Sequence, residues 1–140
     1  MPKMALLLAT DTWEKMDIFQ RFLVNAPKAL WRTRGKLTPE YLSQLSYPLG
    51  LYFFHRSIIK FRANCTCISR GNSQDWPLSM TPPEFRQDRE PYSMFTEISQ
   101  LERVEDTPIW KFPKWNDPQK SYTRGLQALV KVQDILASRV

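Results

Sequence analysis

The stretch LGLYFFHRSIIKF, residues 49–61, decides between a helical and a β fold for this chain. Its aromatic and β-branched side chains are typical of a strand, but a continuous apolar run also fits a buried helix. Because no partner strands are evident elsewhere, we interpret the run as helical. Pro48 then either kinks the preceding helix or opens a new one that extends through Ile59. The sequence therefore predicts a mostly α protein.

Helix start signals upstream favour the same fold class. Asp11 followed by Glu14 is a variant of the capping box, and apolar residues follow at helical spacing until Pro27 ends or kinks the helix. A short helical piece is expected at residues 27–32. Thr38, Pro39 and an acid in the first turn then predict a second helix that ends at residue 46 or 47.

The second half of the chain is interpreted as a connector followed by helices. Residues 69–92 hold several prolines and a Gly-Asn-Ser turn, so they predict an extended segment packed on a surface. Residues 93–106 place apolar side chains at helical spacing, and Asp117-Pro118 opens a last helix to about residue 138. We expect one irregular helical domain over residues 1–140, with a basic helical half (about 1–70), an extended connector rich in proline and aromatic residues (about 69–92) and C-terminal helices (about 93–140).

The charge of the chain is unevenly distributed. The net charge is +6, and residues 1–70 carry eleven Lys and Arg against four Asp and Glu. Such a surface attracts nucleic acid, anionic lipid or an acidic protein, although it can also be simply well solvated. The predicted surface for an anionic partner consists of Lys28, Arg32, Arg34, Lys36, Arg56, Lys60 and Arg62.

Trp31 lies within the densest basic segment, residues 28–36. Its cations can bind phosphates while Trp31 stacks or wedges against a partner. The same pattern also fits a basic helix end with Trp31 in the core. A second aromatic cluster, residues 110–115, fits either a partner's groove or a loop folded over its own core. The predicted protein-interface anchors are Trp31, Trp76, Trp110, Phe112 and Trp115.

Catalytic and metal-binding patterns are missing from the sequence. His55, Cys65 and Cys67 are the only soft metal ligands, and their spacing matches no common zinc site. Glycine occurs only four times, and no phosphate-binding or nucleophile motif is present. We therefore expect no catalytic residue, no metal and no cofactor, and we interpret the chain as a non-enzyme. The two cysteines provide no disulfide framework, which favours a reducing compartment.

In composition the chain resembles accessory subunits of large mitochondrial assemblies, which are short, basic, rich in Trp, Tyr and Pro, and poor in Gly. The resemblance implies a non-catalytic structural subunit that contacts other protein subunits, first in a mitochondrial inner-membrane respiratory complex, with anionic lipid head groups near its basic half. A ribosomal, mitoribosomal or other ribonucleoprotein component that contacts RNA is the alternative, and a cytoskeletal or adaptor protein is a further one. No stretch is apolar for long enough to predict a transmembrane helix.

Overall fold

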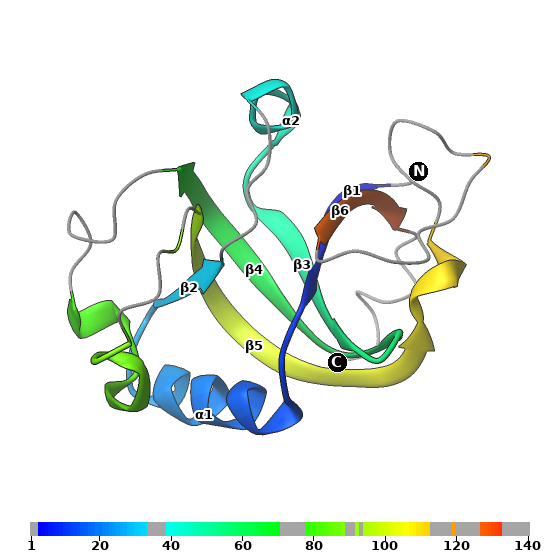
Figure 1. Cartoon of the computed structure of the whole chain (residues 1–140). Coiled ribbons are helices and arrows are strands. Elements are labelled where there is room, and N and C mark those ends of the chain that lie inside the picture. The colour runs from blue at the N-terminus through cyan, green and yellow to red at the C-terminus, as the bar shows by residue number, and fades with distance from the viewer. Residues whose placement is uncertain are drawn as a thin grey trace.

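The computed structural model shows a mostly β protein built on one sheet (Figure 1). It describes residues 3–33, 39–70, 78–88, 92, 94–112, 119 and 127–132. The strands are β1 (Lys3–Ala9), β2 (Ala29–Thr33), β3 (Leu49–His55), β4 (Ile58–Arg70), β5 (Met94–Pro108) and β6 (Gln127–Val132). The α-helices are α1 (Trp13–Val24) and α2 (Pro39–Gln44), and the 3-10 helices are η2 (Leu78–Met80), η3 (Pro83–Phe85) and η4 (Ile109–Lys111).

The sheet has the strand order β2-β5-β4-β3-β1-β6 and curves into a half-barrel (Figure 1). β1 is parallel to β3, and the other neighbouring pairs are antiparallel. Arg56 and Ser57 form the tight turn between β3 and β4, and both have positive φ angles, as a two-residue hairpin loop requires. The chain between β1 and β2 contains α1. This connection runs from β1, which lies next to one edge of the sheet, to β2 at the opposite edge.

Side chains of β1 and β3 alternate between two apolar clusters, one on each face of the sheet. The larger cluster contains Leu6 of β1, Phe53 of β3 and two residues of α1, Met16 and Phe19. The smaller cluster lies on the opposite face, where β1, β3, the start of β4 and the end of β5 pack against η4. Its members are Ala5, Leu7, Tyr52, Phe54, Ile59, Val104, Ile109 and Phe112.

Two of the expected helices are present. α1 begins after Thr12, whose side chain accepts a hydrogen bond from the backbone N–H of Lys15 at 3.2 Å, so Thr12 rather than Asp11 is the cap. The helix ends at Val24, before Pro27 as predicted. α2 begins at Pro39 and ends at Gln44, two or three residues earlier than expected.

The prediction of a mostly α fold is wrong, and residues 49–61 show the reason. Leu51 and Phe53 face the larger cluster, whereas Tyr52 and Phe54 face the smaller one. A strand covered on both faces needs apolar side chains at every position, and this removes the alternation that distinguishes a strand from a buried helix. The run forms β3, the hairpin turn and the start of β4.

β5 imitates a helix for a different reason. Ile98 and Leu101 are three residues apart, yet both belong to the larger cluster. Gln100 between them has a φ of 56°, and the pairing with β4 shifts register in this region. An extra residue in a strand converts the two-residue repeat into a three-residue spacing, which resembles the helical i, i+3 pattern.

The remaining helix predictions also need correction where the structure describes the chain. The short helix expected at residues 27–32 is replaced by β2, which pairs with β5. The last helix, expected at residues 118–138, is contradicted by β6, whose residues pair with β1. The expected connector begins while the chain is still in β4, and its described part, residues 78–88, forms η2 and η3. Residues 71–77 and 133–140 lie outside the described ranges.

Candidate functional site

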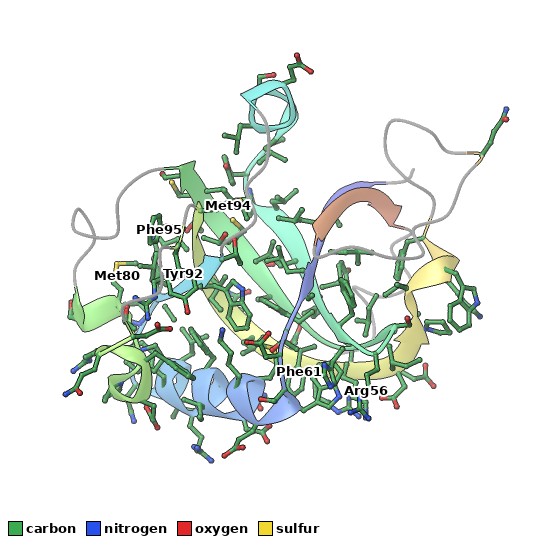
Figure 2. All side chains as sticks on the ribbon, viewed as in Figure 1. Arg56, Phe61, Met80, Tyr92, Met94 and Phe95 are labelled. Atoms are coloured by element: carbon green, nitrogen blue, oxygen red, sulfur yellow. The ribbon has the colours of Figure 1, made fainter. Side chains whose placement is uncertain are left out.

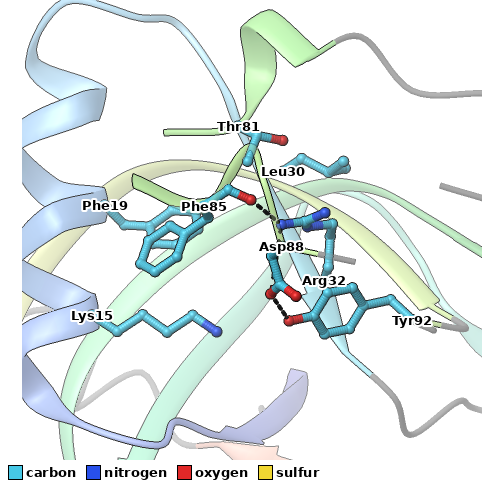
Figure 3. Close-up of a pocket in the computed structure, with 8 residues that line it drawn as sticks. All are labelled: Lys15, Phe19, Leu30, Arg32, Thr81, Phe85, Asp88 and Tyr92. Atoms are coloured by element: carbon cyan, nitrogen blue, oxygen red, sulfur yellow. Dashed lines mark hydrogen bonds and ion pairs between the residues drawn. The ribbon is translucent and has the colours of Figure 1, made fainter. Parts of the chain in front are cut away.

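A small polar pocket lies where α1, the edge strand β2 and the η2–η3 segment meet (Figure 3). It encloses about 240 Å³ between its walls, including space open to solvent. Figure 2 places Tyr92 with Met80 at this end of the sheet, far from Arg56 in the β3–β4 turn. The lining residues are Lys15, Phe19, Leu30, Arg32, Thr81, Phe85, Asp88 and Tyr92.

Lys15 supplies an ammonium group to the pocket from the first turn of α1. Its Nζ lies 4.3 Å from the ring centroid of Trp31 and 5.6 Å from that of Phe85, a cation–π arrangement. Burial lowers the pKa of this ammonium, while the charges of Asp11 and Asp88 raise it and that of Arg32 lowers it. The amine is therefore a partly desolvated cation beside aromatic surface.

Arg32 is held rigidly on β2. Its Nη2 donates a hydrogen bond to the backbone oxygen of Phe85 at 2.7 Å and lies 3.9 Å from Oδ2 of Asp88. Its guanidinium stacks over the ring of Tyr92, with 4.8 Å between Cζ and the ring centroid. The Arg32 side chain is only 11% exposed. This residue therefore ties the η3 segment to β2 and still faces the pocket.

The segment that forms the outer wall is fixed by its own contacts. The Tyr92 hydroxyl donates a hydrogen bond to Oδ2 of Asp88 (Figure 3). Arg86 Nε donates a hydrogen bond to the backbone oxygen of Thr81 at 2.8 Å. The Phe85 ring stacks on Phe19 of α1, with 5.5 Å between ring centroids. The wall therefore combines an acid, a phenol and an aromatic ring in defined positions.

Of the five predicted cations that the structure describes, Arg32 alone lines this pocket. Three others form ion pairs with acids of β5: Lys28 with Glu97 at 2.7 Å, Lys60 with Asp106 at 3.7 Å, and Arg62 with Glu102 at 3.3 Å. Arg56 is exposed in the hairpin turn, and Arg34 and Lys36 lie outside the described residues. Acids from the second half of the chain thus partly neutralise the basic half.

The predicted aromatic anchors divide into buried, exposed and undescribed residues. Trp31 is 1% exposed and packs between Phe19 and Phe53, and Phe112 is 5% exposed, so both belong to the core of this chain. Trp110 is 54% exposed. Trp76 and Trp115 lie outside the described residues.

His55 and the cysteines are not assembled into one site. His55 Nδ1 lies 3.0 Å from the backbone oxygen of Thr10, at the turn end of β3. Cys65 pairs with Leu49 at the other end of that strand, about 20 Å away at 3.3 Å per residue. Burial raises the pKa of Cys65 to about 12, so its thiol is a poor nucleophile. Within the described ranges, no three His, Cys, Asp or Glu side chains are grouped to bind a metal ion.

Sequence reasoning missed most of the pocket. Lys15 lies in the first predicted helix but is not among the predicted site residues, and Phe85, Asp88 and Tyr92 fall in the stretch interpreted as a connector. A long irregular segment rich in charged and aromatic residues is itself a weak signal of a functional loop.

Among the described residues, no helix has the length and apolar character needed to cross a membrane. No protein-family model, curated protein or solved structure matches the chain.

Proposed function

We propose that this protein is a non-catalytic nucleic-acid-binding module whose pocket accepts one unit of a single-stranded chain, with RNA as the first candidate. The observation that supports the proposal is the grouping of Lys15 and Arg32 with the rings of Phe85 and Tyr92. Cations attract the phosphate backbone, and bases stack on aromatic rings. The Phe85 and Tyr92 rings are partly exposed, with one face of Phe85 against Phe19 and one face of Tyr92 against Arg32. The net charge of +6 favours association with any polyanion.

The pocket is small and partly open, because the volume of about 240 Å³ between its walls includes space that belongs to solvent. A nucleotide would therefore lie across the mouth of the pocket, with its neighbours in solvent, rather than be enclosed by it. Lys28 precedes β2 and its side chain is 46% exposed, but its ion pair with Glu97 offsets its charge.

The experiment measures binding of an unstructured, fluorescent RNA of about 16 nucleotides by fluorescence anisotropy over a range of salt concentrations. We expect the affinity to fall with salt and Lys15→Met to weaken binding several-fold while reducing the salt slope by about 0.7. Lys111→Met removes the same charge from an exposed position in η4 and is the matched control. The proposal fails if the wild type does not bind RNA at low salt, or if both variants bind equally.

Trp110 favours a second candidate, an accessory subunit of a large assembly. An exposed indole is the type of side chain that dominates protein–protein interfaces. The first assembly to consider is a mitochondrial respiratory complex, with anionic lipid near the basic surface. Native purification from the source should then recover the protein with partner subunits, and Trp110→Ala should release it without unfolding it. Recovery of a free monomer in both cases would exclude this candidate.

A further inference from the structure

Arg32 is directed toward the protein rather than toward solvent. Its side chain is only 11% exposed, its Nη2 donates a hydrogen bond to the backbone oxygen of Phe85 at 2.7 Å, and its guanidinium lies over the Tyr92 ring. An arginine that binds a phosphate directly needs N–H groups that are open to the ligand. Arg32 therefore contributes to the pocket through the residues that it holds in place.

Phe85 is the residue that Arg32 holds by a hydrogen bond, and other contacts fix it further (Figure 3). Its backbone N–H donates to the backbone oxygen of Pro82 at 2.9 Å, and its ring stacks on Phe19 with 19° between the ring planes. The Phe85 residue is nevertheless partly exposed. A ring that is fixed before binding loses little side-chain freedom when a base stacks on it, and this favours binding.

Lys15 places a cation beside the same ring. Its Nζ lies 5.6 Å from the ring centroid of Phe85 and 4.3 Å from that of Trp31. The charges of Asp11 and Asp88 act on this amine, but within the described ranges no carboxylate lies close enough to form an ion pair with it. A cation beside an aromatic ring provides two contacts for one nucleotide, one for the phosphate and one for the base.

We propose that Phe85 is the ring on which a base stacks, that Lys15 contacts the phosphate, and that Arg32 is a positioning residue, which fixes Phe85 instead of contacting the RNA. This inference rests on the proposed function and assigns separate roles within it. The roles differ in what their removal changes. Loss of a phosphate contact lowers the salt slope, whereas loss of stacking or of positioning lowers the affinity and leaves the slope unchanged.

The test measures binding of the same unstructured RNA by fluorescence anisotropy over a range of salt concentrations. Phe85→Leu keeps an apolar side chain against Phe19 and removes the aromatic ring, so it should weaken binding about tenfold at an unchanged salt slope. Arg32→Lys keeps the charge but not the planar guanidinium. It should weaken binding about threefold, also at an unchanged slope, and should cause no further loss in the Phe85→Leu protein.

Arg62→Lys is the matched control, because Arg62 also lies on a strand with a side chain that is 16% exposed, and it pairs with Glu102 of β5. It should leave the RNA affinity unchanged. Arg32→Met removes the charge at Arg32 and should reduce the salt slope by less than Lys15→Met does.

Three results would overturn the inference while RNA binding itself persists. Phe85→Leu could bind with wild-type affinity, Arg32→Lys could match the Arg62→Lys control, or Arg32→Met could reduce the salt slope as much as Lys15→Met does. Thermal unfolding verifies that each variant is folded, and the affinity of Phe85→Leu decides the matter if the Arg32 variants are not. If the wild type binds no RNA, the proposed function fails together with this inference.

Discussion

Replacing Trp31 provides the sharpest test of the core, because the sequence also allowed this side chain to be a partner anchor. Its ring packs against Phe19 with 4.9 Å, and against Phe53 with 4.7 Å, between ring centroids. Removing a fully buried indole destabilises a protein by about 3–5 kcal/mol through lost burial and a residual cavity. We therefore expect Trp31→Ala to lower the free energy of unfolding by about 4 kcal/mol.

The structure also predicts how much a smaller change at Trp31 matters. Its indole Nε1 is buried and has no hydrogen-bond partner among the described residues. Trp31→Phe therefore removes volume and an unpaired N–H, but no hydrogen bond, and should destabilise the protein by only about 1–2 kcal/mol. The cation–π contact with Lys15 can persist on the phenyl ring.

Urea unfolding followed by circular dichroism measures both changes. With a slope of about 2 kcal/mol per molar urea, Trp31→Ala should shift the midpoint by about 2 M. Trp110→Ala is the matched control within the same chain, because that indole is 54% exposed and its removal should matter by less than about 0.5 kcal/mol. Equal and small effects at the two tryptophans would refute the assignment of Trp31 to the core.

Three further predictions concern titratable and charged groups. Because burial raises the pKa of Cys65 to about 12, iodoacetamide at about pH 8 should alkylate the partly exposed Cys67 first and reach Cys65 only after unfolding, as mass spectrometry would show. Burial lowers the pKa of Lys15 in the folded state, so the unfolded chain binds more protons between the folded pKa and 10.5. The free energy of unfolding should therefore rise with pH over this interval, relative to that of Lys15→Met. Urea titrations at a series of pH values measure this difference. A double-mutant cycle on Arg62 and Glu102, 3.3 Å apart across β4 and β5, should give a coupling of about 0.5–1 kcal/mol that decreases with added salt.

Local signals were sufficient for the helices and insufficient for the sheet. α1 and α2 are marked by a capping side chain, a proline and first-turn acids, all within a few residues of each helix start. The strands depend on partners far away in the chain: β2 pairs with β5, and β1 lies between β3 and β6. A single sequence shows the residues of each strand but not which strand covers its open edge.

The interpretation of the charges failed for the same physical reason. Counting by halves placed an excess of cations in residues 1–70, but Glu97, Glu102 and Asp106 of β5 meet cations of the first half through strand pairing. Opposite charges on neighbouring strands can be recognised only when the register is known. Arg32 was predicted to meet an anion. Its pocket neighbours Asp88 and Tyr92 can be recognised only in the folded structure, where they lie beside it.

The position of β1 has a consequence for how the protein forms during synthesis. Leu6 is registered with Leu51 of β3 on one side and with Leu129 of β6 on the other. The first strand to be synthesised therefore cannot complete its pairing until much later segments of the chain have been made. Closing such long loops slows folding relative to helical proteins of similar size. Until β6 emerges from the ribosome, β1 keeps an open edge that can pair with another nascent chain. Expression at lower temperature, or with chaperones, should accordingly increase the soluble yield.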